Sequence, residues 1–112
     1  MALTPKQLVN VELTTSFVTM YTVPSSTKTR LTEILLCNTA GADRTVTVCV
    51  VESGDSATES TPNANAIMKA FSLPQGLPIA LPFNTWLETG DLISAKASGT
   101  GVVFIASGIE EA

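Results

Sequence analysis

The stretch ILLCNTAGADRTVTVCVV (residues 34–51) decides the fold class, because two runs of strand-forming residues flank a short loop. Valine, isoleucine and threonine favour β-strands, and the central Asn, Gly and Asp favour a turn. We therefore predict a β-hairpin in which Ile34 and Leu36 lie on one face with Val46, Val48 and Val50. The opposite face would carry Leu35, Cys37, Thr45, Thr47, Cys49 and Val51.

The same pattern of strand-forming runs continues along the whole chain of 112 residues, with Gly, Pro, Asn and Asp interrupting short Val- and Thr-rich runs. We predict strands at 16–23, 29–38, 44–51, 66–73, 79–83, 85–88, 92–97 and 102–108, and a polar loop at 53–65. About eight short, evenly spaced strands indicate an all-β fold, a two-sheet antiparallel sandwich or a jelly roll. Residues 14–112 would form this domain, and residues 1–13 an N-terminal arm or a short strand.

Alternation within each predicted strand selects the residues of the core. Beside the inward residues of the hairpin, we expect further inward side chains in the other strands: Tyr21, Val23, Leu73, Leu92, Val103 and Ile105.

The two cysteines, Cys37 and Cys49, raise the question of a disulfide. The most compact hairpin register that keeps the valines inward places Cys37 opposite Thr47 and Cys49 opposite Leu35. The cysteines are then diagonal neighbours about 7–8 Å apart, and disulfides rarely form beyond about 7 Å between Cα atoms. We therefore predict two reduced thiols on the outer face.

The composition excludes several classes of function. Only 14% of residues are charged, the formal net charge is −4 and histidine is absent. The few Lys and Arg residues form no basic stripe, so we expect no nucleic-acid binding. No apolar run reaches the ~20 residues that span a bilayer, and the N-terminus lacks the layout of a secretory signal. We expect no membrane partner and synthesis in the cytoplasm.

Candidate catalytic and metal-binding residues are sparse. Without histidine, the usual triads and imidazole metal sites cannot form, so we predict no enzymatic activity, no metal and no cofactor. Glu52, Asp55 and Glu59 in the polar loop could bind a hard cation, but they lack the spacing of a dedicated calcium loop and favour a solvated loop. Trp86 could stack on a sugar ring, although packing in the core or at an interface is favoured.

Two segments carry a resemblance to a known group of proteins. YTVPSSTKTRLTEILLCNTAGADRTVTVCVVESGDSA and LPFNTWLETGDLISAKASGTGVVFIASGIE resemble small bacteriophage virion structural proteins of the β-sandwich or jelly-roll type. The resemblance covers roughly residues 21–110 and rests on turn and core signatures. It implies a module on the particle surface, such as a capsid decoration (cement) protein or a neck or tail accessory protein, with no catalytic residues.

We therefore expect a non-enzymatic virion protein that decorates or bridges capsid or neck/tail subunits and stabilises the particle. It would be a homo-oligomer, with a trimer favoured because trimers suit three-fold lattices. The alternative is a carbohydrate- or receptor-binding module of a phage tail or fibre, with Trp86 or Tyr21 exposed beside polar side chains. The expected interface residues are Leu8, Val9, Val11, Leu13, Leu35, Cys37, Cys49, Val51 and Trp86.

Overall fold

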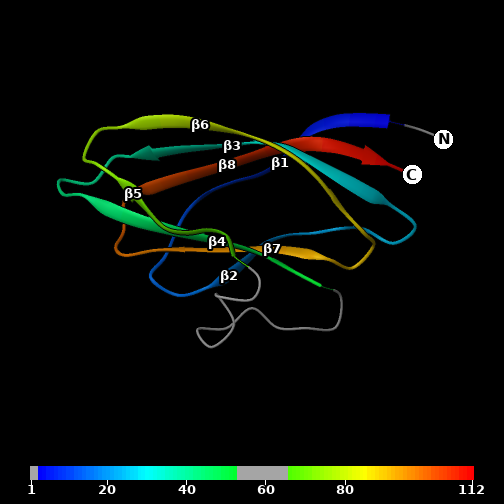
Figure 1. Cartoon of the computed structure of the whole chain (residues 1–112), viewed down its shortest axis with the longest axis horizontal. Coiled ribbons are helices and arrows are strands. Elements are labelled where there is room, and N and C mark those ends of the chain that lie inside the picture. Colours follow the sequence, from blue (N-terminus) through cyan, green and yellow to red (C-terminus); the bar gives the residue numbers. More distant parts are fainter. Residues whose placement is uncertain (1–2, 53–65) are drawn as a thin grey trace.

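The computed structural model describes residues 3–52 and 66–112, which form eight β-strands and no helix (Figure 1). The polar loop predicted at 53–65 lies outside the described residues. The strands are β1 (Leu3–Glu12), β2 (Val18–Thr22), β3 (Lys28–Asn38), β4 (Arg44–Val51), β5 (Ala66–Leu73), β6 (Pro78–Leu87), β7 (Leu92–Ala97) and β8 (Val102–Glu111). The two strands predicted at 79–83 and 85–88 are one continuous strand, β6.

The strands form two antiparallel sheets of four, which lie one above the other in Figure 1. The first sheet has the order β1-β8-β3-β6, and the second has the order β2-β7-β4-β5. The predicted all-β sandwich is therefore confirmed. Strands near the two ends of the sequence pair with each other (β1 with β8, β2 with β7), and strands in the middle of the sequence do the same (β3 with β6, β4 with β5). A chain folded back on itself in this way is a jelly roll.

The core lies between the sheets. Ile34 and Leu36 of β3 and Val46 and Val48 of β4 are fully buried, as predicted, and Val23 and Leu73 are buried with them. Tyr21 and Val50 are half-buried and pack against this core. Leu92, also predicted inward, is only half-buried.

The predicted hairpin of residues 34–51 is wrong. β3 belongs to the first sheet and β4 to the second, so the chain crosses the sandwich between them. The expected hairpin of β7 and β8 is wrong for the same reason, and of the consecutive strands only β4 and β5 pair. The inward residues of β3 and β4 were nevertheless predicted correctly. In either arrangement, paired in one sheet or facing each other across the core, every second side chain of each strand is apolar and points to the core.

The inward assignment of β8 is also wrong. Val102, Phe104 and Ala106 are fully buried between the sheets, whereas Val103 and Ile105 lie on the outer face of the first sheet. The run VVFIA is apolar at every position, so its alternation in sequence does not identify the inward side. The partners of β8 decide it, because Phe104 pairs with the buried Leu36 of β3.

The N-terminal residues form a strand of the domain. β1 pairs with β8 of its own chain along its length, with one bulge between Gln7 and Val9. Val9 and Leu13 are 9% and 1% exposed, respectively, and belong to the core. Residues 3–12 therefore pair within their own chain, and an arm lying on a neighbour would require β1 to leave β8.

Candidate interaction surfaces

The central strands of the first sheet carry apolar side chains on the face that points away from the core. Leu35 pairs with Ile105, and Cys37 pairs with Val103, so these four side chains lie together on that face. All are half-buried, as is Ile109 nearer the C-terminus. In a sheet with one face on the core, the residues that point to solvent are normally polar, so the apolar residues on this face are an exception. We call these five residues the apolar outer face: Leu35, Cys37, Val103, Ile105 and Ile109.

The residues expected at an interface are divided among three environments. Leu35 and Cys37 lie in the apolar outer face, and Trp86, which pairs with Arg30 of β3, is 48% exposed on β6. Of the expected interface residues in the N-terminal segment (Leu8, Val9, Val11 and Leu13), only Val11 is exposed, at 38%. Leu8 packs partly buried against the core that contains Val9 and Leu13. The sequence did not identify Val103 and Ile105 because the alternation of β8 was assigned to the wrong side, and Ile109 lies beyond the strand predicted at 102–108.

Cys49 and Val51 are not available to a partner, contrary to expectation. Their strand register places them on the side of β4 that points away from the core, but they are 2% and 0% exposed. Both cysteines are free thiols, as predicted, although the predicted diagonal pairing is wrong because Cys37 and Cys49 lie in different sheets. Burial raises the pKa of the Cys49 thiol, and the charge of Lys96 partly opposes this shift.

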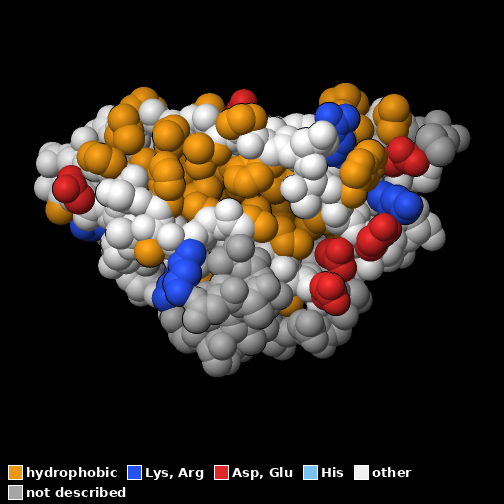
Figure 2. Space-filling model, in the orientation of Figure 1, with side chains coloured by type: hydrophobic (Ala, Val, Ile, Leu, Met, Phe, Trp, Pro, Cys, Tyr) orange, Lys and Arg blue, Asp and Glu red, His pale blue; other side chains and the backbone are white. Residues whose placement is uncertain are grey.

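One side of the sandwich, between the edge strands β5 and β6, is open. Inward-pointing apolar residues of both strands are only partly buried there, although they pack against the core. Figure 2 shows hydrophobic side chains gathered between β6 and β5 on this side of the molecule. We call these residues the open side: Ile67, Phe71, Ile79, Leu81 and Phe83.

A shallow cavity of about 300 Å³ lies beside the exposed indole of Trp86. Its other lining residues are Lys28, Glu88 and Glu111, so an aromatic surface is flanked by charged hydrogen-bonding groups. The Tyr21 ring is placed differently, because its hydroxyl is bonded within the sandwich to Thr29 and Glu110. Of the two aromatic residues considered for a sugar platform, only Trp86 is therefore exposed beside polar groups.

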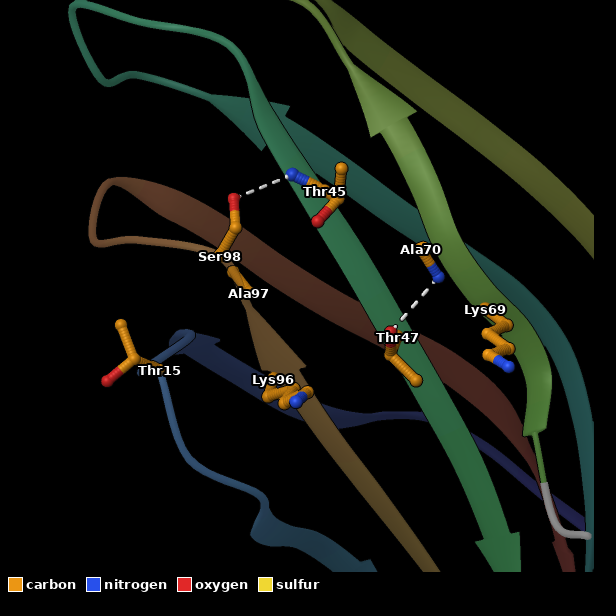
Figure 3. Close-up of a pocket in the computed structure, with 8 residues that line it drawn as sticks. All are labelled: Thr15, Thr45, Thr47, Lys69, Ala70, Lys96, Ala97 and Ser98. Atoms are coloured by element: carbon orange, nitrogen blue, oxygen red, sulfur yellow. Dashed lines mark hydrogen bonds between the residues drawn. The ribbon is translucent and has the colours of Figure 1, made fainter. Parts of the chain in front are cut away.

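A second cavity, of about 330 Å³, lies over β4, β5 and β7 on the outer side of the second sheet (Figure 3). Hydroxyl groups and two lysines, Lys69 and Lys96, dominate its lining. Two of the hydroxyls hold the backbone: the Thr45 N–H donates to Ser98 Oγ, and the Ala70 N–H donates to Thr47 Oγ1. The described residues that line this cavity include no carboxylate, so they offer no acid–base pair.

The part of the chain that the structure describes contains no cluster of His, Cys, Asp or Glu suited to a metal ion. Asp55 and Glu59 of the considered cation loop lie outside the described residues, and Glu52 is exposed. Within the same ranges, no helix is long and apolar enough to cross a membrane.

Comparison with known proteins finds a likeness in structure only. No protein-family model matches the sequence, and no curated protein matches it. The fold is similar to a chain in the structure of infectious bursal disease virus, Gx strain, with a TM-score of 0.53 and 12% sequence identity. The likeness is one of fold. It covers 97% of this chain but 32% of the viral chain, so this chain spans about a third of the length of the structure that it matches.

Proposed function

We propose that this protein is a non-enzymatic structural component of a bacteriophage particle, which decorates or bridges capsid or neck/tail subunits and thereby stabilises the particle. The observation that carries the proposal is the apolar outer face. A solvent-facing sheet surface built from Leu35, Ile105 and their neighbours gains free energy when another protein covers it, at about 25 cal/mol per Å² of apolar area removed from water.

The fold is consistent with this role. Jelly rolls occur in viral capsid proteins and in lectins, and the similar solved chain belongs to a virus structure. Fold alone does not define function, so the proposal rests on the surface and takes the fold as support. The bacteriophage origin comes from the sequence resemblance of residues 21–110.

The partners in this proposal are copies of the same chain and the major capsid or neck/tail proteins of the same virion. The oligomer would be built from copies of this chain, for which the sequence favoured a trimer, and nucleic acid and membranes are not expected as partners. Binding a neighbour that recognises only the folded protein stabilises the fold by mass action. The same linkage would stabilise the particle when the protein occupies junctions between subunits.

The test is incorporation of a charge variant into particles. Ile105→Lys places a charge at the centre of the apolar outer face without changing the core, and we expect at least about tenfold less protein in purified particles, because an unpaired charge would be buried. Thr19→Lys is the matched control, since Thr19 is exposed on β2 of the other sheet. Equal incorporation of folded Ile105→Lys and Thr19→Lys would contradict the proposal.

A specific observation supports a second candidate function, carbohydrate binding at the Trp86 cavity. The exposed indole and the flanking Lys28, Glu88 and Glu111 supply a stacking surface and hydrogen-bonding groups. Trp86 is the sole tryptophan of the chain, so its fluorescence reports directly on this cavity. A glycan that shifts this fluorescence, binds to Trp86→Phe and fails to bind to Trp86→Ala would support the function. A glycan screen without a hit would count against it.

A further inference from the structure

The segment that forms the open side is almost without charge. Residues 66–87, which include β5, β6 and the turn between them, contain one charged residue, Lys69. Lys69 is exposed and lines the cavity on the outer side of the second sheet. Covering Ile67, Phe71 and the inward residues of β6 would therefore bury no charge from this segment, so these residues add no charge-desolvation cost to an interface.

The backbone of β6 limits the kind of partner that can cover the open side. The Asn38 N–H donates to the Leu77 carbonyl, which fixes the hydrogen-bonding alternation between β3 and β6. Leu77, Ile79 and Leu81 turn their backbone groups toward β3, so Pro78, Ala80 and Pro82 turn theirs toward the open edge. Proline has no N–H, so only Ala80 offers a donor among these three residues.

The β5 edge is irregular as well. Its pairing with β4 is interrupted on both sides of Val48, and Ala70 has a φ of 49°, outside strand geometry. Prolines and bulges at sheet edges oppose the addition of another strand. An extended peptide that joins either sheet is therefore a poor occupant, and the open side must be covered through side-chain contacts.

We propose that two copies of this chain pack open side against open side about a two-fold axis. The contact is isologous, so each copy presents the same uncharged residues to the other. Leu81 and Phe83 of each copy would then complete a core that the single chain leaves partly exposed, as obligate dimer interfaces do.

The size of the molecule permits this contact. Figure 2 looks down the shortest axis, so the open side lies on the broadest side of the molecule, whose extents are 45 × 29 Å. A stable interface of standard size needs about 800 Å² from each partner, and the outline of the molecule in this view is large enough to contain a patch of that size. The proposed function includes association between copies of this chain but does not say which surface they use. This inference names that surface, and it rests only on the association of copies and not on the virion role.

The test uses the purified full chain without particles. Light scattering after size exclusion, over a dilution series, should give twice the 11.7 kDa mass of the chain. Leu81→Lys should raise the dimer dissociation constant at least roughly 30-fold, because it buries a charge at the centre of the contact. Thr19→Lys, at an exposed residue of β2 away from β5 and β6, is the matched control and should leave the dimer unchanged.

A second measurement applies if Leu81→Lys fails to fold. In a dilution series of the unmodified protein followed by NMR, amide signals of β5 and β6, including Ala80, should shift while those of Leu35 and Ile105 stay constant. A monomer at all concentrations would overturn the inference, as would a mass of three copies, which would instead fit a trimer. A dimer broken by Ile105→Lys and not by Leu81→Lys would also overturn it. Particle incorporation is measured separately, so failure of the dimer and failure of the virion role are distinguishable.

Discussion

The hydroxyl of Tyr21 donates a hydrogen bond to the carboxylate of Glu110, and this bond joins the two sheets of the sandwich. Tyr21 lies on β2 of the second sheet and Glu110 on β8 of the first. The Thr29 hydroxyl, on β3, lies 2.7 Å from the same phenol oxygen, and Lys6 of β1 forms an ion pair with Glu110 at 3.4 Å. Four strands therefore meet at one polar cluster beside the core.

We predict that Tyr21→Phe lowers the free energy of unfolding by about 1–2 kcal/mol, because it removes the phenol hydroxyl that is hydrogen-bonded to Thr29 and to Glu110 beside the core. Chemical denaturation followed by circular dichroism measures the difference. Lys6→Met is the control for the exposed ion pair and should cost less than about 1 kcal/mol. Equal losses in the two variants would show that the hydroxyl bond contributes nothing specific.

The stability of the protein should fall at high pH through the same residue. Burial and the bond to Glu110 raise the pKa of Tyr21 to about 12, from the usual value near 10. Below pH 10 the phenol is protonated in both states and its stabilising effect is complete. Between pH 10 and 12 the unfolded chain loses this proton first, so the free energy of unfolding decreases.

Tyr21 is the only tyrosine of the chain, so ultraviolet absorbance of the tyrosinate follows its titration directly. The difference in unfolding free energy between the parent protein and Tyr21→Phe should shrink across this range, while contributions from the lysines cancel. A tyrosinate titration near pH 10 in the folded protein would contradict the prediction.

Asn38, the last residue of β3, should be a polar position that is highly sensitive to substitution. It is fully buried, and its Nδ2 donates to the carbonyls of Ala42 and Leu73 while its Oδ1 accepts the Ala40 N–H. Asn38→Leu removes all three bonds, and we expect a loss of about 2–4 kcal/mol of unfolding free energy. The exposed neighbour Thr39, which donates to the Gly101 carbonyl, is the control, and Thr39→Val should cost about 0.5–1 kcal/mol.

The two thiols should differ in reactivity. Cys37 is half-buried on the apolar outer face, whereas Cys49 is buried and its pKa is raised by burial. A thiol reagent should modify Cys37 at least about tenfold faster than Cys49 in the folded protein, because Cys49 must first become accessible and ionise. Single-cysteine variants, Cys49→Ser and Cys37→Ser, measure each rate. Comparable rates would contradict the burial of Cys49.

Thiol labelling also connects to the virion proposal. If a particle subunit covers the apolar outer face, Cys37 should become protected from the reagent in purified particles. Pairing through the open side should leave Cys37 reactive, since its side chain is on the outer face of the first sheet.

The sequence was sufficient for the strands and for much of the core. Alternation around Ile34 and Leu36, and around Val46 and Val48, identified inward residues that are fully buried. It failed at Val103 and Ile105, because a run that is apolar at every position has no alternation to read. For residues 1–13 it left an arm and a short strand as alternatives, and it did not identify Val9 and Leu13 as core residues.

The apolar outer face was only partly predictable. Leu35 and Cys37 were placed correctly, since they alternate with buried residues of the same strand. Their neighbours on β8 could not be found, because that requires knowing that β3 pairs with β8, a strand more than sixty residues away. The open side was not anticipated at all, since it depends on β5 and β6 being edge strands of different sheets.

By itself, the amino-acid sequence determined that the chain is all-β, where its strands lie, and that it carries little charge and no histidine. Local propensity and alternation encode these properties, because they depend on neighbouring residues. Only the tertiary structure decided which strands share a sheet, and hence that Cys37 and Cys49 lie in different sheets and that Cys49 is buried. Pairing between distant strands depends on packing of the whole chain, which no local pattern contains.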